Sequence, residues 1–136
     1  MISTTDSWVS EFIESPQFFF IDDLMKEKAP GILSYFMEEC HKSFPDFPQN
    51  VDTIELRNIL ENKLIYLDIP TIIKLGIPLL CSEFALFISS STMFIEAQNW
   101  APALARANKA FQERVTDKKI KGVSIQYDVS KTNRND

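Results

Sequence analysis

The chain has 136 residues, a formal net charge of −5 and 45% hydrophobic residues, which fits one domain built around a single core. Its two cysteines exclude a disulfide framework, because such a framework needs more cysteines at regular spacing, and we expect reduced thiols in an intracellular protein. With only three glycines, the chain has no glycine-rich loop for a phosphate group, so no nucleotide cofactor is expected.

The acidic charge is concentrated in the first half of the chain. Residues 1–63 carry 12 acidic and 5 basic groups, a net −7, whereas residues 64–136 carry 7 acidic and 9 basic groups, a net +2. An acidic surface repels the phosphate backbone, so we expect no nucleic-acid partner.

No segment predicts secretion or a membrane span. The first twenty residues have no basic residue ahead of an apolar block. The longest uncharged apolar run, Phe84–Ile95, has 12 residues, whereas a spanning helix needs roughly 20. We therefore expect a cytoplasmic protein with no membrane partner.

Two helices are expected at the start of the chain, a short one and a second that runs from Pro16 to a break at Ala29–Gly31. Capping residues precede an amphipathic helix over 8–13, and Pro16 can open the next helix. That helix carries three consecutive phenylalanines, which cannot all share one helix face. Either the three side chains fill a junction of the core, or some of them are exposed and bind a partner. The candidate partner-binding residues here are Phe18, Phe19 and Phe20.

The next predicted elements are a break at Ala29–Gly31 and a strong amphipathic helix over 32–43. A rigid loop over 44–50 contains two prolines. Asp52, with Glu55 three residues later, resembles a capping box and predicts a helix that begins at this point.

A short helix is then expected after Pro70, followed by a break near Gly76–Pro78, because proline removes a backbone donor and clashes with the preceding turn. From there to about Gln98 we expect a further helix. Serines and β-branched residues are mediocre helix formers, however, so a β-hairpin stays open for residues 84–97.

Alanines dominate the predicted helix from Trp100 to about Val115. Its buried stripe contains Trp100, Ala103, Ala107 and Ala110. A helix whose stripe is mostly alanine lets a neighbouring helix come close, and a small-and-aromatic stripe lies just upstream. The pattern predicts a tightly packed helix pair, which suggests a scaffold rather than a catalyst. Trp100 is a further candidate partner-binding residue.

Residues 123–129 alternate between apolar and polar side chains, which predicts a strand. One strand cannot satisfy its own backbone, so it pairs within the domain, pairs with another chain to form a homo-oligomer, or stays loose. Tyr127 is therefore another candidate partner-binding residue. The predicted fold is mainly α, a single-domain antiparallel array of about six helices over 1–130, with this C-terminal β-strand and a frayed polar tail at 131–136.

Chemistry-bearing residues are sparse. Glu38 and His41 have the Glu-x-x-His spacing of dinuclear metal sites, but such a site needs the pair twice and His41 is the only histidine. We interpret Asp22 and Asp23 as solvated charges early in a helix, where negative charge is favourable. We therefore assign no catalytic, cofactor-binding or metal-binding residue.

Residues 87–111 resemble a tetratricopeptide-type helix-turn-helix unit. The large, small and large positions of the first helix are matched by Phe87, Ser91 and Phe94. The aromatic and small positions of the second helix are matched by Trp100, Ala103, Ala107 and Ala110. Ser91 departs from the usual glycine or alanine, and no proline closes the unit. The resemblance implies that a peptide or a helix binds in a groove.

Three functions follow from these features. The leading one is a non-catalytic protein–protein interaction domain, a scaffold or adaptor that binds a protein or peptide partner. The alternative is a small acidic inhibitor of the immunity-protein type that neutralises a basic partner through charge complementarity. A second alternative is an enzyme whose site is assembled from scattered residues, with a concave pocket around His41 or Asp22 and a perturbed pKa as its sign.

Overall fold

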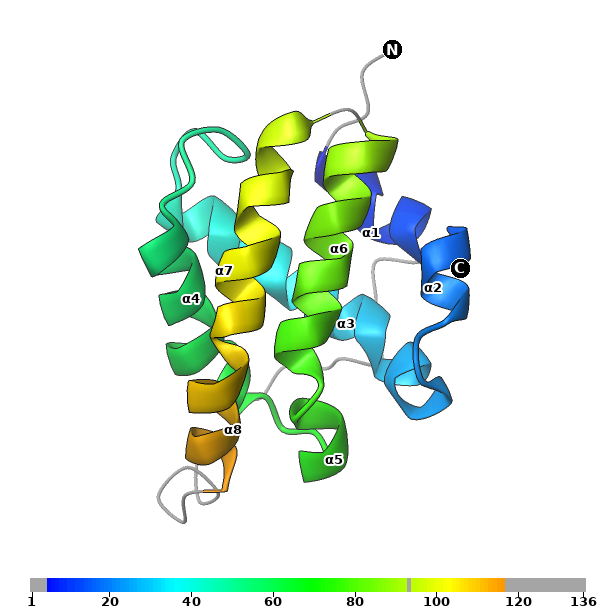
Figure 1. Cartoon of the computed structure of the whole chain (residues 1–136), viewed down its shortest axis with the longest axis vertical. Helices are drawn as coiled ribbons and strands as arrows, with labels where there is room; N and C mark the ends of the chain where they lie inside the picture. Colours follow the sequence, from blue (N-terminus) through cyan, green and yellow to red (C-terminus); the bar gives the residue numbers. More distant parts are fainter. Residues whose placement is uncertain (1–4, 93, 117–136) are drawn as a thin grey trace.

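The structure, a computed structural model, describes residues 5–92 and 94–116. In these ranges the chain forms eight α-helices and two short 3-10 helices, so the prediction of a mainly α fold is confirmed (Figure 1). In chain order they are α1 (Thr5–Ile13), α2 (Pro16–Phe19), α3 (Asp23–Ser43), α4 (Thr53–Asn62), η1 (Leu64–Tyr66), α5 (Thr71–Lys74), α6 (Ile77–Ser91), η2 (Ile95–Asn99), α7 (Trp100–Arg106) and α8 (Asn108–Val115). The predicted strand over 123–129, Tyr127 and the tail at 131–136 lie outside the described residues.

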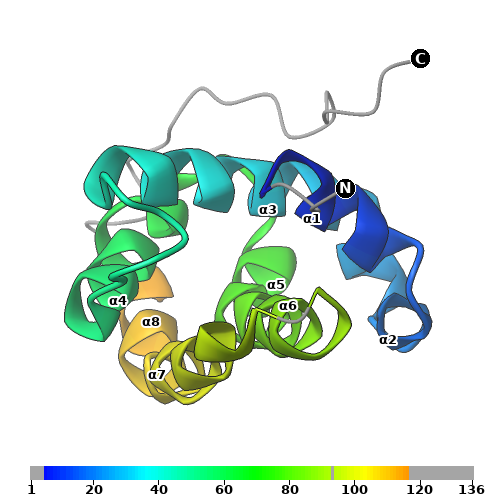
Figure 2. The ribbon, with the colours of Figure 1, turned by 90° about the horizontal axis from the view of Figure 1, so that it is seen from above.

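The long helix α3 lies along one side of the molecule, and α4, α7 and α6 lie along the other (Figure 2). Helices α6 and α7 are antiparallel neighbours, and α8 continues from the lower end of α7 beside α4 (Figure 1). The buried apolar side chains form one continuous core between these elements. Within the described ranges, no helix is both long enough and apolar enough to cross a membrane.

The helix predicted to run from Pro16 to Ala29–Gly31 is instead divided at residues 20–22 into α2 and α3. Helix α3 also shows that the predicted break at Ala29–Gly31 is wrong. The helix continues through Pro30, which it carries in its interior. A proline there removes one backbone hydrogen bond and costs about 3 kcal/mol. Ala29, Ile32 and Leu33 are fully buried around it, and the burial of this apolar stripe offsets the cost. Tertiary packing therefore overrides the local signal.

Helix α6 begins at Ile77, which confirms the predicted break near Gly76–Pro78. Pro78 lies in the first turn, where a backbone amide would have no acceptor within the helix, so its absence in proline costs no hydrogen bond. The helix ends at Ser91 rather than at Gln98. Beside this end, the Thr92 hydroxyl donates a hydrogen bond of 2.6 Å to the carbonyl of Ile88, a local bond that competes with helix continuation. The β-hairpin left open for residues 84–97 is wrong, since residues 84–91 lie in α6 and residues 95–97 in η2.

Helices α6 and α7 form a close pair, but not through the predicted upstream stripe. Ser90 and Ser91 are exposed, and Phe94 lies beyond the end of α6. The buried hydroxyl of Ser82 on α6 donates a hydrogen bond of 3.1 Å to the backbone carbonyl of Ala101 on α7. A side chain as short as serine can reach that carbonyl only because the two helices lie close together. Ala101, Ala103 and Ala107 are buried, whereas Ala110 is half-buried. The single predicted helix over 100–115 is divided at Ala107 into α7 and α8.

Both cysteines are free and buried, Cys40 on α3 and Cys81 on α6. Burial raises the pKa of each thiol above its ordinary value, since a thiolate in an apolar core is poorly solvated. The carboxylate of Glu39 and the nearby Cys81 raise the pKa of Cys40 further. Little thiolate is therefore available on either residue near neutral pH.

We expect the folded protein to react with Ellman's reagent roughly 100-fold more slowly than the protein unfolded in guanidinium chloride, because reaction requires an opening of the core. The measurement is the absorbance time course under both conditions, and both thiols should titrate in the unfolded protein. Rapid titration of one thiol in the folded protein would contradict the buried positions.

Candidate functional site

Large apolar side chains are exposed around one cavity. In the described residues, eight large hydrophobic side chains are exposed, and four of these eight line the same cavity of about 440 Å³. The four are Phe20, Leu24, Ile72 and Leu79, with exposed fractions between 52% and 83%. We call this cavity the α3–α6 groove, since its walls are the first turn of α3, the short helix α5 and the first half of α6.

Local structure sets the direction of the phenylalanines on α2. The Ser15 hydroxyl caps this helix by accepting a hydrogen bond of 3.3 Å from the backbone amide of Phe18. Phe18 is buried, and its ring meets Phe12 edge-on at a centroid distance of 5.5 Å. With Phe18 held in the core, Phe19 and Phe20 face outward, 73% and 83% exposed, and only Phe20 lines the groove.

The floor of the groove belongs to the core. Its members Met25, Ile73 and Leu80 are buried. Gly76 lies between α5 and α6, where a Cβ atom would stand 2.9 Å from the terminal methyl of Met25. The missing side chain at this position therefore lets Met25 pack against the start of α6. The groove thus combines a fixed floor with exposed apolar walls.

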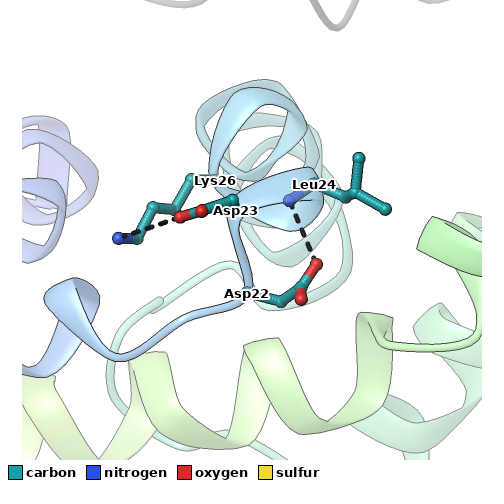
Figure 3. A network of polar contacts seen from close by, with 4 residues as sticks. All are labelled: Asp22, Asp23, Leu24 and Lys26. Atoms are coloured by element: carbon teal, nitrogen blue, oxygen red, sulfur yellow. Dashed lines mark hydrogen bonds and ion pairs between the residues drawn. The ribbon is translucent and has the colours of Figure 1, made fainter.

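Among the described residues, the charged side chains that line the groove are two carboxylates, Asp22 and Glu83, and both are exposed. Asp22 also caps α3, because its Oδ2 atom accepts a hydrogen bond of 3.0 Å from the backbone amide of Leu24. Figure 3 shows that the adjacent pair of Asp23 and Lys26 points to the other side of this turn. The charged lining of the groove is therefore acidic.

The two lysines on the elements that form the walls do not line the groove. The Nζ atom of Lys26 lies 3.5 Å from Asp23 Oδ1 and 5.1 Å from the ring centroid of Phe19. Partial burial lowers the pKa of Lys74, and the charge of Asp68 acts in the opposite direction. Neither lysine therefore stands between the carboxylates of Asp22 and Glu83 on the surface of the groove.

Phe18 and Trp100, two of the predicted contact residues, lie in the core. Trp100 is buried, and its ring stacks on Phe47 at a centroid distance of 5.6 Å and meets Phe94 at 5.9 Å. Their side chains are therefore unavailable to a partner in this fold. Phe19 and Phe20 are the described candidates that stay accessible.

His41 lies away from the groove. It is exposed, and its Nε2 atom is 3.1 Å from the hydroxyl oxygen of Thr5. Its ring packs against Phe47 at a centroid distance of 4.8 Å. His41 and Asp22 were the residues expected to mark an enzyme pocket, and of these two only Asp22 lines the α3–α6 groove.

The other exposed side chains that line the groove were not predicted from the sequence, namely Leu24, Ile72 and Leu79. Each is followed in the chain by a buried apolar residue, namely Met25, Ile73 and Leu80. Neighbours on a helix point about 100° apart, so one member of such a pair is often left outside the core. Other adjacent apolar residues, such as Ile59 and Leu60, are both buried, so the sequence alone does not single out the three pairs at the groove.

No protein-family model matches the chain, and neither a curated protein nor a solved structure matches it. The tetratricopeptide resemblance of residues 87–111 stays a prediction. Within 5–92 and 94–116, no three histidine, cysteine, aspartate or glutamate side chains come together in a group that could hold a metal ion.

Proposed function

We propose that this chain is a non-catalytic protein-interaction domain, a scaffold or adaptor that binds a polypeptide partner in the α3–α6 groove. The observation that carries the proposal is the gathering of Phe20, Leu24, Ile72 and Leu79 around one cavity. Exposed apolar surface that is gathered in one place is typical of binding sites. Each Å² of it that a partner covers contributes about 25 cal/mol.

The groove has the features that concentrate binding energy in protein interfaces. An aromatic side chain, Phe20, stands at its edge, and the buried floor of Met25, Ile73 and Leu80 can receive apolar side chains without reorganisation of the core. The groove lies on the first half of α6 and so outside residues 87–111. The proposal therefore does not depend on the tetratricopeptide resemblance.

Selection of a random peptide display library against the full chain tests this function. We expect enrichment of apolar peptides, followed by titration of the best synthetic peptide in a calorimeter. Phe20→Ser and Leu79→Gln should each weaken its binding roughly tenfold or more, since a central apolar contact of an interface contributes about 1–2 kcal/mol.

The matched control is Ile54→Gln. Ile54 is 75% exposed on α4, which lies on the opposite side of the molecule from α2 (Figure 2), so this variant loses an exposed apolar side chain without touching the groove. Its affinity should stay within twofold of the parent. If no peptide is enriched, or if all three variants bind the selected peptide equally, the groove is not the binding site.

A further inference from the structure

We infer that the segment bound in the α3–α6 groove is an amphipathic helix with lysine or arginine residues beside its apolar face. This inference rests on the proposed function and names the chemistry of the partner. Two properties of the groove carry it: the helical walls, and the negative charge of the side chains that line it.

The walls favour a helical occupant. The walls are α-helices, so the groove has no strand edge along which an extended peptide could pair its backbone, although the first amides of α3 and α6 have no acceptor within their own helices. A helix satisfies its own backbone internally and presents only side chains to a groove. On α6 the lining extends from Leu79 to Glu83, which is about 6 Å at a rise of 1.5 Å per residue. That length matches about one turn of a bound helix, with apolar anchors at i and i+4.

The charge of the lining favours a basic occupant. The exposed carboxylates of Asp22 and Glu83 stand beside the apolar walls, while Lys26 in the first turn of α3 and Lys74 on α5 do not line the groove. An acidic partner segment would meet like charge at both carboxylates. A lysine or arginine can instead lay its apolar stem on Phe20 or Leu79 and place its cation on a carboxylate.

The test uses two synthetic probes and the full chain. Each probe is a designed amphipathic helix of about 18 residues, or five turns, with leucine on one face. The other positions are lysine in the first probe and glutamine in the second. Fluorescence anisotropy measures the affinity of both probes at low and at physiological salt. At low salt, we expect the lysine probe to bind roughly tenfold more tightly than the glutamine probe, since each exposed charge pair contributes modestly. The difference between the two probes should shrink at physiological salt, because salt screens exposed charges.

Two double variants with the same change in net charge identify the groups responsible. D22N/E83Q removes both carboxylates of the groove, and asparagine preserves the cap of α3. E96Q/E113Q removes two exposed carboxylates on η2 and α8. We expect the first double variant to lose most of the preference for the lysine probe, and the second to keep it.

Each other outcome is decisive. Equal affinity of the two probes would overturn the basic partner while leaving the proposed function standing, whereas failure of both probes would count against that function too. An equal loss in the two double variants would assign the preference to long-range charge and overturn the role of the groove. Tighter binding of a synthetic peptide with the sequence of residues 117–136 would make the chain's own segment the occupant and overturn a separate partner.

Discussion

Replacement of Phe12 by alanine should lower the free energy of unfolding by about 3–5 kcal/mol. Phe12 is fully buried at the meeting point of α1, α2 and α6. Its ring lies 5.5 Å from that of Phe18 and 5.4 Å from those of Phe84 and Phe87. Its removal leaves a cavity among these three rings, because the helices that carry them cannot move together far enough to fill the space. Guanidinium chloride unfolding, followed by circular dichroism, measures the loss.

The matched control is Phe20→Ala, the same substitution at a side chain that is 83% exposed. Its free energy of unfolding should stay within about 0.5 kcal/mol of the parent. Phe12→Leu should give an intermediate loss, and it provides a measurable variant if the alanine variant does not fold. Equal losses for Phe12→Ala and Phe20→Ala would show that the aromatic junction is not a centre of the core.

This junction also connects stability to the candidate site. Phe12 holds Phe18, and Phe18 holds α2 with Phe19 and Phe20 facing outward. The outward position of Phe20, which lines the groove, therefore depends on a buried phenylalanine. A partner that covers Phe20 binds only the folded state, so its binding should raise the stability of the whole domain.

Local signals in the sequence predicted the start of α2 from Pro16 and the start of α4 from Asp52, although Ser15 was not predicted as a cap. Ser15 caps α2 before Pro16, and Asp52 caps α4 by accepting a hydrogen bond of 2.9 Å from the backbone amide of Ile54. These bonds join residues two or three positions apart, so the sequence contains all that is needed. In contrast, whether the helix continues through Pro30 depends on burial against distant elements. Its local signal alone pointed to a break, whereas the packed apolar stripe keeps α3 continuous.

The candidate site could be predicted only in part. The run of three phenylalanines singled out the right segment, but which of the three is buried depends on Phe12 and α6. The groove joins Phe20 and Leu24 to Ile72 and Leu79, residues that lie about fifty positions apart in the chain. No periodicity relates them, because the connection is made by α3 and α5 packing against α6 in the folded protein.

Replacement of Ala101 by leucine should lower the free energy of unfolding by about 1–3 kcal/mol, because it inserts a branched side chain between two helices that are already close. Ala101 is 4% exposed, and its backbone carbonyl accepts a hydrogen bond from Ser82 across the helix pair. The larger side chain must push α7 away from its neighbours or adopt a strained rotamer. Thermal and guanidinium chloride unfolding measure the effect.

Ala105→Leu is the control on the same helix. Ala105 is half-buried, so the larger side chain can extend toward solvent, and leucine is nearly as good a helix former as alanine. Its cost should stay within about 0.5 kcal/mol. If Ala101→Leu costs no more than Ala105→Leu, the alanines of α7 are not what brings α6 and α7 together. A selective loss at Ala101 would instead mean that α6, which forms one wall of the groove, is held in place by the small residues of the helix beside it.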